Sequence, residues 1–163
     1  MKIVDRSSGL DVLDRDECYR LLAEEQVGRL GIVANGRPLI LPVNFDLDEA
    51  AIVFRTAPGT KLHAGPKSPA CFQVDRFDDE TRSGWSVLAS GELHHVDSFQ
   101  HTTWRRLQDL EVDPWAEGAR PHWMRLRVER ISGRKVGGQA PPSTGSSGEA
   151  GPDDASGGTI SSR

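Results

Sequence analysis

The sequence lacks the features of several common functional classes. Its 163 residues carry a formal net charge of −4, whereas proteins that capture nucleic acid electrostatically need a basic surface to displace counterions. No apolar run approaches the ~20 residues of a membrane helix, and the opening stretch "MKIVDRSSGLDVLDRDE" has no apolar core of a secretory signal. We therefore expect a cytoplasmic protein that binds neither nucleic acid nor a membrane.

Cysteine is scarce, with only Cys18 and Cys71 in the chain. They form no CxxC motif and no cluster with histidine, which argues against a structural zinc site. The spacing leaves open one disulfide or two reduced thiols, and reduced thiols fit a cytoplasmic protein better. His94 and His95 are neighbours in a strand-like run, so their side chains point to opposite faces and do not grip one metal ion together. We expect no metal site.

The C-terminal part of the chain differs in composition from the rest. Residues 137–163 contain 7 Gly, 6 Ser and 3 Pro and very few apolar side chains. Such a segment buries too little surface to offset its chain entropy. We expect one folded domain within residues 1–136 and a disordered tail over 137–163.

Two stretches show helical spacing. The first begins at Asp14, which with Glu17 forms a pair resembling a capping box, and it is expected to end near Gln26. The second has apolar residues at helical intervals from Phe99 to Leu110, with Ser98 as its expected cap. These two helices flank the main run of strands.

The remaining pattern alternates with a period of two, which is typical of strands. Asn35-Gly36 suits a type I′ hairpin turn, Pro42 indicates an unpaired stretch or a sheet edge, and Gly91 is a candidate bulge. Hairpin spacing without regular strand–helix alternation favours a mainly β fold, an antiparallel barrel, over a doubly wound sheet. The expected strands lie near residues 27–34, 37–48, 50–56, 69–77, 84–96 and 122–131.

The stretch "FRTAPGTKL" is a candidate phosphate-binding site. Arg55 offers a planar fork and Lys61 a point charge for phosphate oxygens, and backbone N–H groups at a helix start near Thr60 would favour an anion. The hydroxyls of Thr56 and Thr60 would complete the shell. The stretch lacks the P-loop pattern GxxxxGK[ST], so an ordinary surface loop with two solvated charges remains the alternative.

Four stretches in order, "GRLGIVANGRPLILPVNF", "VFRTAPGTKL", "FQVDRF" and "GWSVLASGEL", resemble the FMN-binding split-barrel family that includes pyridoxamine 5′-phosphate oxidase. The resemblance covers most of residues 13–134 and is closest to short actinobacterial-type members with a leading helix. It implies a six-stranded antiparallel split β-barrel of the FMN-binding type. It also implies a homodimer with two flavin sites at the subunit interface.

The resemblance also implies roles for particular residues. Arg55, Thr56, Thr60 and Lys61 match the phosphate-binding run of the family. The strand that faces the flavin ring is matched by Pro42, Val43 and Asn44, and a segment beside the ribityl chain and phosphate is matched by Trp85, Ser86 and Val87.

These matches imply an FMN-dependent oxidoreductase that acts on an unidentified small molecule by hydride transfer at the flavin N5. The C-terminal substrate-binding block of true pyridoxamine oxidases is not recognisable, which argues against pyridoxamine phosphate as the substrate. Two alternatives stay open: a reductase that uses a deazaflavin cofactor, and a binding protein that holds flavin or haem without turnover. In the haem case His63 or His94 would be the candidate ligand.

Overall fold

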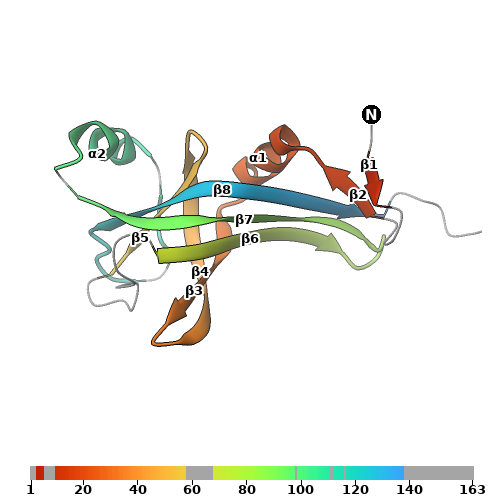
Figure 1. The fold of residues 1–163 in the computed structure, drawn as a ribbon, viewed down its shortest axis with the longest axis horizontal. Coiled ribbons are helices and arrows are strands. Elements are labelled where there is room, and N and C mark those ends of the chain that lie inside the picture. The colour runs from red at the N-terminus through yellow and green to blue at the C-terminus, as the bar shows by residue number, and fades with distance from the viewer. Residues whose placement is uncertain are drawn as a thin grey trace, which may run out of the picture.

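The computed structural model of the protein describes residues 3–5, 10–57, 68–97, 99–110, 112–115 and 117–137 (Figure 1). Thr60, Lys61, His63 and Ser98 lie outside the described residues, as does nearly all of the predicted tail. The strands that form the barrel are β3 (Val27–Ala34), β4 (Arg37–Asp48), β5 (Ala51–Thr56), β6 (Ser68–Asp78), β7 (Ser83–Val96) and β8 (His122–Val136).

These six strands close into a ring in the order β8-β5-β4-β3-β6-β7, because β7 also pairs with β8. Every pairing is antiparallel, so the expected six-stranded antiparallel barrel is confirmed. In Figure 1, β6, β7 and β8 run side by side along the molecule, and the β3–β4 hairpin projects away from them. The strands β4 and β5 share only a short ladder, from Phe45 to Asp48.

Two short strands precede the barrel and were missed by the sequence analysis. The strand β1 (Ile3–Asp5) pairs with β2 (Leu10–Leu13), and β2 continues the sheet along the end of β8, where Leu13 faces Gly133. Segments of three and four residues are too short to show an alternating pattern. Here the long partner strand β8 supplies the hydrogen bonds that make them strands.

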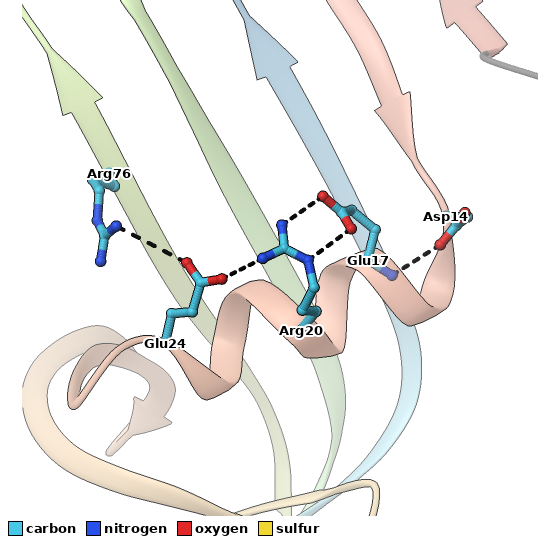
Figure 2. Close-up of polar contacts among 5 residues, drawn as sticks. All are labelled: Asp14, Glu17, Arg20, Glu24 and Arg76. Atoms are coloured by element: carbon cyan, nitrogen blue, oxygen red, sulfur yellow. Dashed lines mark hydrogen bonds and ion pairs between the residues drawn. The ribbon is translucent and has the colours of Figure 1, made fainter.

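The helix α1 (Arg15–Ala23) follows β2 and begins at the predicted cap. The Asp14 carboxylate accepts a hydrogen bond from the Glu17 backbone N–H at 2.9 Å (Figure 2). The helix ends at Ala23, earlier than the expected Gln26. The helix ends early because the barrel pairing begins at Gln26. The Gln26 carbonyl accepts a hydrogen bond from the Phe45 N–H of β4 at 3.1 Å, so Gln26 pairs with a strand and does not extend the helix.

A chain of exposed ion pairs lies along α1. Arg20 bonds both oxygens of Glu17 and also contacts Glu24, and Glu24 lies 4.0 Å from Arg76 of β6 (Figure 2). The hydrogen bond from Arg20 lowers the pKa of the Glu17 carboxyl. Exposed pairs of this kind contribute little stability each. Their contact with β6 nevertheless links the helix to the barrel.

The opposite face of α1 enters the barrel core. Cys18 and Leu22 are fully buried there, together with Phe54 and Phe72 of the strands. Burial raises the pKa of the Cys18 thiol, with Asp14 and Glu17 adding to the shift. Cys18 is buried, Cys71 is exposed, and both are free, so the interpretation as two unpaired thiols is confirmed.

The second helix, α2 (His101–Gln108), packs on the outside of the barrel. It begins with Gln100 at the cap position, later than the Ser98 cap that the sequence suggested, and the Asp97 carboxylate accepts the Phe99 N–H. The carboxylate of Asp97 therefore binds a backbone donor just before the helix. Beneath α2 lies a second hydrophobic cluster made of Val53, Val96, Leu107, Val112 and Trp123.

Two glycine predictions are confirmed. Asn35 and Gly36 have φ of 51° and 72°, the positive values that a tight hairpin turn requires. At Gly91 the β7–β8 register shifts, and a Cβ there would lie 1.9 Å from the Arg127 carbonyl oxygen. Only glycine permits that approach. Among the described residues, no helix is long and apolar enough to cross a membrane.

Candidate functional site

The strands β4 and β5 separate at one end of their shared ladder, and we call this point the fork. The last pair is Phe45 with Phe54, so Asn44 and Arg55 are the first residues beyond it on the two strands. Within the described part of the chain, residues 37–44 of β4 pair with β3 alone. Pro42 pairs with Arg29 of β3, so of the two expected alternatives, an unpaired stretch or a sheet edge, the described residues show the edge. This free edge of β4 offers backbone polar groups to a ligand.

Arg55 is held in a fixed position at the fork. Its Nε donates a hydrogen bond to the Arg120 carbonyl oxygen at 2.9 Å. Its guanidinium carbon lies 5.6 Å from the ring centroid of Trp123, its direct partner on β8. A cation over an aromatic face is favourable. The hydrogen bond uses Nε, and within the described residues the two terminal nitrogens make no further hydrogen bond.

Asn44 occupies the other arm of the fork, and its side-chain amide is bonded at both ends. Its Oδ1 accepts the Trp115 backbone N–H at 3.0 Å, and its Nδ2 donates to the Gln26 carbonyl oxygen at 3.4 Å. Asn44, one of the predicted site residues, thus binds the segment before β8. Nothing in the sequence pattern indicated that Trp115 would be its partner.

The connection from α2 to β8 is thus fastened to both arms of the fork. Trp115 attaches it to β4 through Asn44, and Arg120 attaches it to β5 through Arg55. Further back, Val112 anchors the same connection in the second hydrophobic cluster. Three fixed points along one short segment make the fork a prearranged site rather than a loose loop.

Thr56 follows Arg55 and points to the other side of the sheet. It is buried, and its hydroxyl donates to the Ala57 carbonyl oxygen at 3.5 Å. Across the ladder lies His122, whose Nδ1 is 3.4 Å from Nε2 of His95. This contact joins His95 of β7 to His122 of β8. The described residues hold no cluster of three or more metal-ligating side chains.

Pro42 and Val43 lie on the free part of β4 and differ in exposure. Pro42 is exposed on the outer face, opposite Arg29 of β3. Val43 is partly buried against the barrel core. A ligand at this edge would therefore meet the ring of Pro42 and the β4 backbone, with Val43 supporting the strand from within.

The segment Trp85, Ser86 and Val87 lies far from the fork in the same chain. Trp85 pairs with Lys135 of β8, whereas Arg55 pairs with Trp123, so the two positions are separated by about 40 Å of strand. Figure 1 shows the start of β7 and the end of β5 at opposite ends of the molecule. The side chains of Trp85 and Val87 are buried in the core. One chain therefore does not bring all the predicted site residues together.

Comparison with known proteins agrees with this fold. Residues 14–135 match the family model of pyridoxamine 5′-phosphate oxidase. A FAD-binding protein from Mycobacterium smegmatis is 31% identical, with 77% of this chain and 97% of that chain covered and a TM-score of 0.65. A FAD-binding protein from Mesorhizobium loti is 27% identical, with 78% and 98% covered and a TM-score of 0.63.

A sequence relative gives the same picture. An uncharacterized protein of Mycobacterium tuberculosis is 30% identical over 131 residues, which is 76% of this chain and 84% of the relative. The match to the family model begins at Asp14 and ends at Lys135. It therefore spans α1, all six barrel strands except the last residue of β8, and both arms of the fork.

Proposed function

This chain belongs to the pyridoxamine 5′-phosphate oxidase family, and we propose that it is an FMN-dependent oxidoreductase that holds the flavin phosphate at the fork. The observation that carries the proposal is the fixed guanidinium of Arg55 beside the free edge of β4. Two similar solved structures, which cover 77% and 78% of this chain, are FAD-binding proteins. Their binding of a flavin supports the same class of cofactor here.

The residues at the fork fit a flavin phosphate. A guanidinium pairs with phosphate oxygens through parallel N–H donors, and Arg55 is already held by the Arg120 carbonyl and by Trp123. Less side-chain entropy is therefore lost on binding. Lys61 and Thr60, which lie outside the described residues, are proposed to complete this shell.

The free edge of β4 fits the ring of the cofactor. Backbone N–H and C=O groups that lack a strand partner seek hydrogen bonds, and the polar edge of a flavin ring provides both donors and acceptors. Pro42 and Asn44 lie on this edge, one residue on either side of Val43. The bound flavin would supply hydride transfer at N5, while these residues bind and orient it.

The distance between the fork and Trp85–Val87 supports a homodimer. Because about 12 residues of β8 separate these groups in one chain, we propose that the partner supplies the Ser86 side chain and the backbone of Trp85–Val87 to each site. The side chains of Trp85 and Val87 stay buried in the partner's own core. The barrel strands also expose apolar side chains that a partner chain would cover. They include Val33 of β3, Ile40 of β4 and Leu88 of β7.

The identity of the cofactor has three candidates within this proposal. FMN is our first choice, FAD is suggested by the relatives, and a deazaflavin has the same ring shape and a phosphate. For the haem alternative, His94 Nε2 lies 3.6 Å from a carboxylate oxygen of Glu92 and makes no hydrogen bond in the described part of the chain. The substrate is proposed to be a small molecule.

The proposed activity is tested by spectroscopy of the reconstituted protein. The protein with bound flavin should show the flavin absorption bands, and a nicotinamide donor under anaerobic conditions should bleach them. Return of the bands on adding an electron acceptor would complete one cycle. A protein that binds flavin but is never reduced would be a carrier, and the oxidoreductase proposal would then be wrong.

A further inference from the structure

The most exposed tryptophan lies at the fork. Trp115 is 72% exposed, although a side chain of its size is normally buried to a large extent. Its backbone is nevertheless fixed, because its N–H donates to Asn44 Oδ1 at 3.0 Å. An exposed aromatic side chain on an anchored backbone is prearranged to contact a ligand.

The surface around Trp115 is suited to a flat ring. Asn44, Pro42 and Ile40 alternate along β4 and so share its outer face. Ile40 is 68% exposed and Pro42 is exposed beside it. Apolar side chains therefore lie next to the free strand edge, where a planar ligand could stack on one side and hydrogen-bond along its rim.

The two ends of the connection from α2 to β8 restrict where the indole can move. Val112 is buried in the second hydrophobic cluster, and the Arg120 carbonyl is bonded to Arg55 at 2.9 Å. The backbone of Trp115 is therefore held at Asn44 of β4, and Asn44 and Arg55 are the first residues beyond the fork on the two strands. The free edge of β4 and the Arg55 guanidinium are the two features that the proposed function assigns to the flavin.

We propose that the indole of Trp115 stacks on the tricyclic ring of the bound flavin and covers the face turned away from β4. This inference rests on the proposed function and adds a residue to it. Stacking of aromatic rings is favourable beyond the area that they bury. An indole in van der Waals contact with a flavin also quenches flavin fluorescence by donating an electron to the excited ring.

The quenching gives a readout that does not depend on turnover. FMN is titrated into the full-length protein and into W115F, W115A and the control W104F, and affinity and flavin fluorescence lifetime are measured together. Trp104 is a matched control because it packs partly buried against the second cluster. We expect a short lifetime in the wild type and in W104F, and a longer one in W115F with nearly the same affinity.

The alanine variant adds a second expectation. W115A should lengthen the lifetime and weaken FMN binding by about three- to tenfold, the effect of losing one aromatic stack. Circular dichroism and size-exclusion chromatography check that the variants keep their fold and oligomeric state.

Three outcomes would overturn the inference. An unchanged lifetime in W115F and W115A, with FMN bound, would show that Trp115 does not touch the ring while the proposed function stands. Loss of the oligomer in W115F and W115A would make Trp115 an interface residue instead. Failure of the wild type to bind any flavin would defeat the proposed function, and this inference with it.

Discussion

Arg55 and Arg120 are joined by a hydrogen bond from Nε of the first to the backbone carbonyl of the second, at 2.9 Å. A guanidinium held by a carbonyl keeps its full charge, because its partner is neutral. In the described part of the chain, Arg55 is therefore fixed by a neutral hydrogen-bond partner. An arginine in that condition is suited to bind an anion.

The first prediction concerns the affinity for FMN. Replacing Arg55 or Lys61 with alanine should each weaken FMN binding by about 1.5–3 kcal/mol, the scale of a lost hydrogen bond to a charged group. Fluorescence or calorimetric titration measures the change. Arg37→Ala is a suitable control, because Arg37 is an exposed cation beside the Asn35-Gly36 turn. Unchanged affinity in both R55A and K61A would contradict the assignment of the phosphate site.

The second prediction concerns the role of Asn44 in holding the fork together. Asn44→Ala removes two hydrogen bonds, the one that Asn44 Oδ1 accepts from the Trp115 N–H and the one that Asn44 Nδ2 donates to the Gln26 carbonyl oxygen. The change should lower the free energy of unfolding by about 1–2 kcal/mol. Asn44→Asp keeps an acceptor for the Trp115 N–H and should cost less. Chemical denaturation of the three proteins gives the comparison, and equal stability of all three would refute the connecting role.

The third prediction concerns acid stability through α1. The hydrogen bond from Arg20 lowers the pKa of Glu17 in the folded state from its ordinary value of 4.5. Because the folded pKa is lowered, the ion pair stabilises the fold fully at pH values above 4.5. That contribution is lost as the pH falls through the lowered pKa, where the carboxylate takes up a proton.

This effect is measured as the difference in unfolding free energy between the wild type and Arg20→Gln. The difference should be constant at neutral pH and shrink in acid, and added salt should reduce it because the pair is exposed. A difference that grows as the pH falls would show that the sign of the linkage is wrong.

The fourth prediction concerns the bulge in β7. Gly91→Ala places a Cβ at 1.9 Å from the Arg127 carbonyl oxygen, and backbone must shift to relieve the clash. Overpacking of this kind typically costs about 1–3 kcal/mol. Gly31→Ala is the matched control, because the nearest atom there is the Sγ of Cys71 at 2.6 Å, which can rotate away. Equal melting temperatures for the two variants would contradict the explanation.

The barrel could be predicted from local patterns in the sequence. Alternation marked the long strands, Asn35-Gly36 marked the hairpin, and Gly91 marked the bulge, because each depends on neighbours within the same strand or turn. The short β1 and β2 strands could not be predicted, since they depend on the end of β8 far along the chain.

The site was predictable only in part. Arg55 stood out because a cation, a glycine and two hydroxyls lie close together in sequence. Its bond to Arg120 and its contact with Trp123 could not be foreseen, because they join segments 65 and more residues apart. The Asn44–Trp115 hydrogen bond also joins distant segments, 71 residues apart, and could not be foreseen either. It places at the site an exposed tryptophan that belongs to no sequence motif.

The central claim is that the fork binds a flavin phosphate. The most direct test is absorbance and mass spectrometry of the cofactor released from the purified full-length protein, followed by titration of the stripped protein with FMN. The account predicts a yellow protein, a released molecule with the mass of FMN, and saturable rebinding that R55A weakens. A colourless protein that rebinds neither FMN, FAD nor a deazaflavin would contradict it.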